Sequence, residues 1–154
     1  MSFSRKAALA LTGLAALAMP LAVAGSASAS TDARCTVTPL KPVLDHLNSS
    51  GEKVIKYATE VTCSAGRSIE ILDERRDHDN LSTDDFEGSN TWNLRFDSTY
   101  TVTKYVLAVL PDADGWGDDN EEMYHSVGFQ VTEDNGYVSA WTNWDDSPMV
   151  QFKL

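Results

Sequence analysis

Short segments rich in β-branched and aromatic residues dominate the chain from residue 35 onward, and polar or glycine-containing connectors separate them. In the segment 53–63, Tyr57 and Val61 fall on one face while Lys56 and Glu60 fall on the other, which is the alternation of a strand with one buried side. Signals for helix starts and ends are nearly absent. The pattern predicts strands at 35–43, 53–63, 67–75, 91–97, 100–110, 123–132, 137–144 and 149–153.

Seven or eight short strands at this spacing predict an all-β fold, namely an antiparallel β-sandwich with an immunoglobulin-like or fibronectin-like layout. A small β-barrel is the alternative. The segment 100–110 is apolar on both faces toward its end, which predicts a central strand. The connectors 73–90 and 111–122 are longer than a hairpin requires, and loops of that kind often carry binding residues.

Residues 1–29 carry the pattern of an export signal. Arg5 and Lys6 precede an apolar stretch over residues 7–24, and residues 27–29 (Ala-Ser-Ala) form the small-residue site at which such leaders are cleaved. The alanine-rich leader resembles those of secreted actinobacterial proteins. We therefore expect a cleaved signal peptide over 1–29, one domain over 30–154, and a secreted, extracellular location.

Cleavage would leave ten basic and 23 acidic residues, so the net charge would change from −11 to −13. Nucleic acids and anionic membrane surfaces would repel such a chain. We therefore expect neither nucleic acid nor membrane as a partner.

Cys35 and Cys63 are the two cysteines of the chain. In an oxidising compartment they are expected to form one disulfide. A hairpin centred near residue 49, in the turn-rich segment 48–51, would place Cys35 opposite Cys63. A metal site would need further cysteine or histidine ligands at a suitable spacing.

The segment 111–122 packs six carboxylates and two glycines into twelve residues. Calcium prefers six to eight oxygen ligands, and the start of this segment resembles the opening of a calcium loop. The EF-hand template fails, however, because Met123 stands where a bidentate glutamate is required. We expect a solvated acidic loop and no cofactor. The alternative is a non-standard calcium loop, with candidate ligands Asp112, Asp114, Asp118, Asp119 and Glu122.

Trp116 lies between two glycines of the same acidic segment. If its indole is exposed, it is a candidate anchor for a partner, because aromatic residues rimmed by charge are enriched in binding hot spots. If the loop folds back, the same indole would cover one end of a sheet.

Tyr137, Ser139, Trp141 and Asn143 share one face of the predicted strand 137–144. If that face is outward, its two aromatic rings could stack against the rings of a sugar chain. If the strand has the opposite phase, Trp141 belongs to the core.

Arg75 and Arg76 lie in a run of mixed charge over residues 73–80. They could contact a partner, although such runs are more often solvated surfaces.

The chain lacks a nucleophile elbow, a free cysteine and the histidine spacings of metal sites or catalytic triads. We expect a secreted, non-enzymatic binding domain, an adaptor or subunit of an extracellular complex that binds another secreted protein and is steered toward a basic partner by its acidic residues. Two alternatives remain: an inhibitor of an extracellular hydrolase, and a carbohydrate-binding module that would use Tyr137, Trp141 and Trp116.

Overall fold

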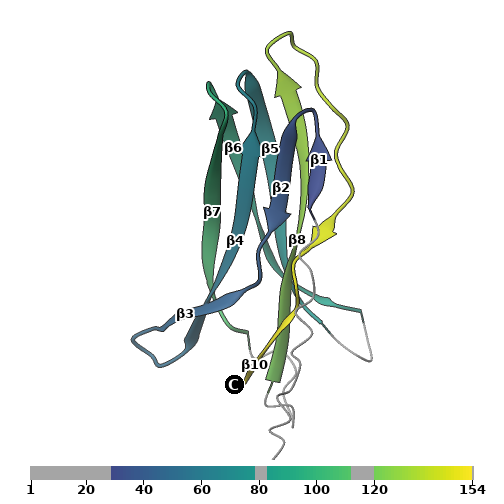
Figure 1. Ribbon diagram of the computed structural model, residues 1–154. Coiled ribbons are helices and arrows are strands. Elements are labelled where there is room, and N and C mark those ends of the chain that lie inside the picture. The colour runs from purple at the N-terminus through teal and green to yellow at the C-terminus, as the bar shows by residue number, and fades with distance from the viewer. Residues whose placement is uncertain (1–28, 79–82, 112–119, 154) are drawn as a thin grey trace, which may run out of the picture.

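The computed structural model describes residues 29–78, 83–111 and 120–153. In this part of the chain, ten strands form two antiparallel sheets that pack face to face (Figure 1). The strands are β1 (Ser30–Asp32), β2 (Cys35–Pro39), β3 (Val43–Leu47), β4 (Lys53–Cys63), β5 (Arg67–Asp77), β6 (Asp85–Phe96), β7 (Tyr100–Val109), β8 (Asn120–Glu133), β9 (Asp145–Asp146) and β10 (Val150–Lys153).

Sheet A is built around β4. Strand β7 pairs along one edge of β4, while β2 and β3 pair one after the other along its opposite edge, with β1 outside β2. In sheet B, β5 and β8 are central, β6 lies outside β5, and β9 and β10 pair with the free side of β8. Strand pairing does not join the two sheets within the described ranges, so the predicted β-sandwich is confirmed and the barrel alternative is wrong.

The expected hairpin around residue 49 brings the two cysteines together. Cys35 pairs directly with Cys63 in the β2–β4 register, and the two form a disulfide. Because the bond closes a loop of 28 residues, it stabilises the fold by about 3 to 4 kcal/mol in the chain-entropy model. The predicted disulfide is therefore confirmed.

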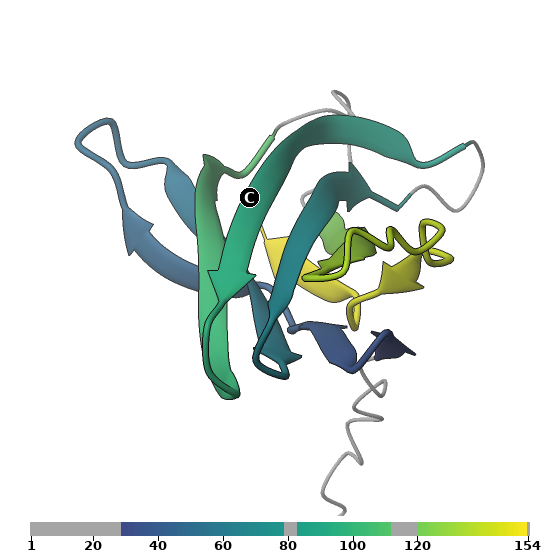
Figure 2. The same ribbon diagram turned by 90° about the horizontal axis from the view of Figure 1, so that it is seen from above.

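The interior consists of two apolar clusters. The larger one surrounds the disulfide, at the end of the sandwich that we call the disulfide end; it is made of Cys35, Val37, Val61, Cys63, Ile69, Ile71, Phe96, Val127, Phe129 and Val131. The smaller cluster lies toward β3, at the end that we call the β3 end, and consists of Ile55, Tyr57, Leu110 and Met123. Toward that end the β3–β4 hairpin reaches away from sheet B (Figures 1 and 2).

A layer of buried polar groups connects the two sheets between these clusters. His125 and Asp73 are both fully buried, and the Nδ1 atom of His125 lies 2.9 Å from Oδ2 of Asp73. Thr59 donates its hydroxyl to the same carboxylate oxygen across the sheets (3.0 Å), and Nε2 of His125 donates to the carbonyl of Leu40 (2.8 Å). Because a carbonyl can only accept, the remaining ring nitrogen and the carboxylate share one proton.

Two expectations about the strands are wrong. The connector expected over 73–90 is mostly strand, because β5 continues to Asp77, β6 begins at Asp85, and the two pair throughout apart from one irregularity between Arg75 and Arg76. Strand β7 lies at an edge and is not central, since β4 is its one partner among the described strands.

The described residues contain no helix, and so none that is long and apolar enough to cross a membrane. The expected signal peptide, residues 1–29, lies outside the described residues except for Ala29.

We predict that breaking the buried pair costs far more stability than an exposed substitution. Asp73→Ala and His125→Ala should each lower the free energy of unfolding by about 3 kcal/mol or more, because each leaves its partner buried and unpaired. The double variant should lose less than the sum of the two. Urea unfolding measures all three, with Thr103→Ala, which is exposed on β7, as control. A loss below about 1 kcal/mol in either single variant would contradict this account of the layer.

Candidate functional site

The outer side of β7 is apolar and exposed. Val102, Val106 and Ala108 face inward and pack against the two clusters, so the residues between them face solvent. Lys104 pairs with the buried Thr59 and therefore lies on the inner side of this edge strand. An inward charge of this kind discourages pairing of a sheet edge with another chain. The outer side of the strand, rather than its edge, is therefore the surface available to a partner.

An apolar patch covers the outer side of sheet A toward the β3 end. We call it the apolar face; it consists of Val43, Val54, Ala58, Tyr105, Leu107 and Val109. Val54 pairs with Val109 and Ala58 with Tyr105, and both β4 residues are buried beside their half-exposed partners, while Lys56 lies between Val43 and Leu107. Val43 and the three β7 residues are between 42% and 56% exposed. Contiguous exposed apolar surface of this kind is typical of interaction sites.

Charged residues of both signs lie on or beside the apolar face. Lys56 lies on the face itself, with its Nζ atom 4.8 Å from the centroid of the Tyr105 ring. Lys53 and Lys104 belong to the same two strands but lie on their inner side, since Lys53 alternates with the buried Ile55 and Lys104 pairs with Thr59. Glu60 lies on the same side of β4 as Lys56, and Asp45 lies on β3, so the charge around the face is mixed.

Residues 137–147, which we call the strap, run along β8 without forming the regular strand expected over 137–144. Three hydroxyl residues of the strap each donate a backbone N–H to the carbonyl of one β8 residue (2.8 to 2.9 Å) and accept that residue's N–H on the hydroxyl (3.0 to 3.1 Å). The pairs are Ser139 with Val131, Thr142 with Phe129, and Ser147 with His125. In these pairs a side-chain hydroxyl accepts the hydrogen bond that a backbone carbonyl accepts in a regular β-ladder.

With these contacts the strap lacks the strict alternation of inward and outward side chains that was expected over residues 137–144. Three steps along the strap from Ser139 to Thr142 match two steps along β8, from Val131 to Phe129. Ala140 and Trp141, which lie between the two hydroxyl residues, are both exposed. Tyr137 and Trp141 are 59% and 47% exposed, while Ser139 between them is buried. The expectation that Tyr137, Ser139 and Trp141 share one face is therefore wrong.

The strap and β1 form the two walls of a groove of about 470 Å³. Three of the residues singled out in the sequence, Tyr137, Trp141 and Asn143, line it together. The other lining residues are small or polar: Ser30, Thr31, Asp32, Ser139, Ala140 and Thr142. The groove thus combines two exposed aromatic rings with hydroxyl, amide and carboxylate groups.

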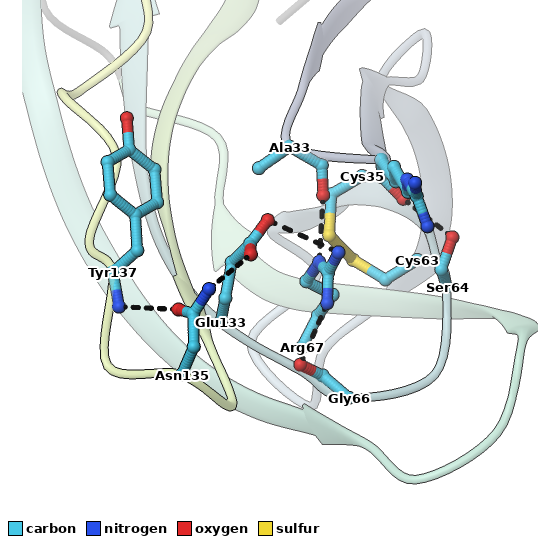
Figure 3. Close-up of polar contacts among 10 residues, drawn as sticks. Ala33, Cys35, Cys63, Ser64, Gly66, Arg67, Glu133, Asn135 and Tyr137 are labelled. Carbon is cyan, nitrogen blue, oxygen red and sulfur yellow. Dashed lines mark hydrogen bonds and ion pairs between the residues drawn. A yellow bond between two sulfur atoms is a disulfide. The ribbon is translucent and has the colours of Figure 1, made fainter.

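A chain of polar contacts connects both walls of this groove to the disulfide end (Figure 3). Arg67 donates to the carbonyl of Ala33, in the turn between β1 and β2 (3.0 Å), and pairs with Glu133 at the end of β8 (3.2 Å). Glu133 accepts from the side chain of Asn135 (3.2 Å), which accepts the backbone N–H of Tyr137 (2.8 Å). Arg67 therefore fixes the position of one wall relative to the other.

Arg75 and Arg76 lie on β5 and not in a loop. Arg75 faces the interior, where its guanidinium carbon lies 6.0 Å from the centroid of the Tyr57 ring. A Cβ atom at Gly88, which has a φ of +126°, would collide with the Arg75 guanidinium, so glycine is needed there. Because its guanidinium faces the interior, Arg75 is not available to a partner. Arg76 is bound to Glu74 (2.5 Å).

Of the five candidate calcium ligands, Glu122 alone lies in the described part of the chain. Asp112, Asp114, Asp118 and Asp119 lie outside the described residues, as does Trp116. Glu122 lies on β8, where Gln151 donates to its carboxylate (2.9 Å). Within the described ranges no group of three or more His, Cys, Asp or Glu side chains could hold a metal ion.

A smaller groove of about 280 Å³ lies on the outer side of sheet B. Its polar residues are engaged with one another: Gln130 donates to Glu70 (2.7 Å), and Arg95 contacts Ser68 (3.4 Å) and Asp134 (2.7 Å). This groove offers fewer unengaged groups than the groove between β1 and the strap.

Sequence reasoning missed the apolar face. Residues 100–110 are apolar on both sides toward their end, and this pattern favoured a central strand over an edge strand with an exposed apolar side. The second wall of the groove was also missed, because three residues such as 30–32 carry no strand pattern of their own.

Comparison with known proteins adds no family. No family model matches the chain, and no curated protein matches it. Among solved structures, the X-ray structure of Northeast Structural Genomics Consortium target SoR45 aligns with a TM-score of 0.37 and 13% sequence identity, over 81% of this chain and 88% of that chain. A similarity of this size supports no inference about function.

We predict a pH-dependent stabilisation when Glu87 is replaced by glutamine. Burial, together with the nearby Asp77 and Asp85, raises the pKa of Glu87 above its ordinary value of 4.5, and Arg75 opposes this in part. A raised pKa means that ionised Glu87 destabilises the folded state, and protonation relieves this as the pH falls. Glu87→Gln should therefore raise the thermal midpoint at pH 7, and the gain should be absent below the ordinary pKa. An equal gain at both pH values, or a loss at pH 7, would contradict the assignment.

Proposed function

We propose that this chain is a secreted, non-catalytic domain that binds another protein through the apolar face of sheet A. The observation that supports this most strongly is the patch of half-exposed valine, leucine and tyrosine side chains on the outer side of β7 and β3. Monomeric proteins rarely expose contiguous apolar surface unless it is used. A partner would bury these side chains, which drives association.

Lys56 adds one charged contact to the apolar face. Because it lies between Val43 and Leu107, the matching surface on the partner is apolar with an acidic group opposite this lysine. This differs from the basic partner suggested by the net charge alone. Net charge acts over the whole molecule, whereas the charge around an interface selects the surface that docks there.

Secretion is supported by the leader pattern of residues 1–29 and by the disulfide, because disulfides persist in oxidising compartments.

A non-catalytic role is supported by the buried histidine and aspartate. Both side chains are fully buried, and the second ring nitrogen of His125 is bound to the Leu40 carbonyl. A general base must reach the substrate proton directly or through one water. His125 is therefore unsuited to act as one.

The test uses residues 30–154, which contain every described strand, as bait in the secreted fraction of the source organism. Leu107→Glu places a charge in the centre of the apolar face. Thr103→Glu is the matched control, because Thr103 lies on the same side of the same strand, opposite Glu60 and away from the apolar residues. A partner that binds both the wild type and the Thr103→Glu control should bind Leu107→Glu at least about 30-fold more weakly, as expected for a hot-spot residue.

Capture that is equal for Leu107→Glu and the wild type would contradict the proposal, as would the absence of any stoichiometric protein. If the captured partner is a hydrolase, its activity in the presence of excess bait distinguishes an adaptor from an inhibitor. Full residual activity indicates an adaptor, while loss of activity indicates an inhibitor.

A further inference from the structure

The groove between β1 and the strap differs in chemistry from the apolar face. Its lining contains two aromatic rings and one alanine but no valine, leucine, isoleucine or methionine. Protein hot spots combine aromatic with aliphatic side chains, as the apolar face does. Aromatic rings surrounded by hydroxyl, amide and carboxylate groups instead match a ligand with flat apolar faces and a rim of hydroxyl groups.

From this we propose that the groove binds a neutral oligosaccharide. Trp141 and Tyr137 would stack against the C–H faces of sugar rings. Asn143, on the strap, and Asp32, on the opposite wall, would form hydrogen bonds with the sugar hydroxyls. The class is neutral because a chain with a net charge of −13 over residues 30–154, and a carboxylate in the groove, repels polyanions.

The groove is preorganised. The strap is bound to β8 at three hydroxyl residues, and the contacts from Ala33 through Arg67 and Glu133 to Asn135 hold the β1 turn and the start of the strap together. A ligand that enters does not have to order either wall, so less conformational entropy opposes binding. Arg67 is a positioning residue in this scheme.

Trp144 provides a matched control within the same strap. It is 48% exposed, much like Trp141, but it lies outside the groove, over Gly128 of β8. Its six-membered ring would lie 3.6 to 3.8 Å from a Cβ atom built on that glycine. Replacing Trp144 removes an exposed indole without changing the lining of the groove.

The test is native gel electrophoresis of residues 30–154 in gels that contain hydroxyethylcellulose, xyloglucan, glucomannan or soluble starch, with polygalacturonate as the anionic control. At least one neutral polymer should retard the wild type, and polygalacturonate should not. Trp141→Ala should weaken the retardation about tenfold, Trp141→Phe should restore part of it, and Trp144→Ala should leave it unchanged. The thermal midpoint of each variant verifies folding.

Retardation by none of the neutral polymers would overturn the proposal, and so would equal sensitivity to Trp141→Ala and Trp144→Ala. If Trp141→Ala abolished capture of the protein partner, the groove would be a protein site and the proposal would also be wrong. Leu107→Glu separates this inference from the proposed function, because it should abolish protein capture while retardation by the polymer persists.

Discussion

The pair formed by Asp73 and His125 lies between the two apolar clusters and divides the interior of the sandwich. On the disulfide side the sheets pack tightly around ten buried apolar residues, whereas the cluster on the other side contains four. The smaller core leaves the β3–β4 hairpin extended beyond sheet B (Figure 2). Tyr105, Leu107 and Val109 of β7 point away from the interior there and are about half exposed. The end of the sandwich with the smaller core is thus the end that carries the apolar face.

Both proposed binding surfaces lie where a sheet ends. Sheet A ends at β7, whose inward Lys104 protects the edge and leaves the apolar outer side available. Sheet B ends at the strap, where side-chain hydroxyl groups accept hydrogen bonds from N–H groups of β8. Trp141, between two of these hydroxyl residues, faces solvent. The two surfaces differ in chemistry because their local sequences differ: aliphatic residues and a tyrosine around one lysine in one, and aromatic residues among serine, threonine and asparagine in the other. A domain with both could attach a protein to a polysaccharide.

The sandwich and the disulfide were predictable because they depend on local patterns, namely period-two alternation and a hairpin centre midway between two cysteines. The continuation of β5 to Asp77 was not, because Asp73, Arg75 and Asp77 are polar residues on the inner side and break the alternation that marks a strand. The strap was not predictable either. Its alternation resembles a strand, and nothing in the sequence distinguishes a serine that docks through its hydroxyl from one that faces solvent. Tyr137, Trp141 and Asn143 line one groove, although the strand geometry from which they were grouped is absent.

If one domain carries two separate binding surfaces, NMR chemical-shift mapping of residues 30–154 distinguishes them. The captured protein partner should shift the amide signals of residues 105–109 and their neighbours on β4. An oligosaccharide from the retarding polymer should shift those of residues 30–32 and 137–143, and each set should respond with the other ligand already bound. If both ligands shifted the same residues, or if one displaced the other, the account of two independent surfaces would be wrong.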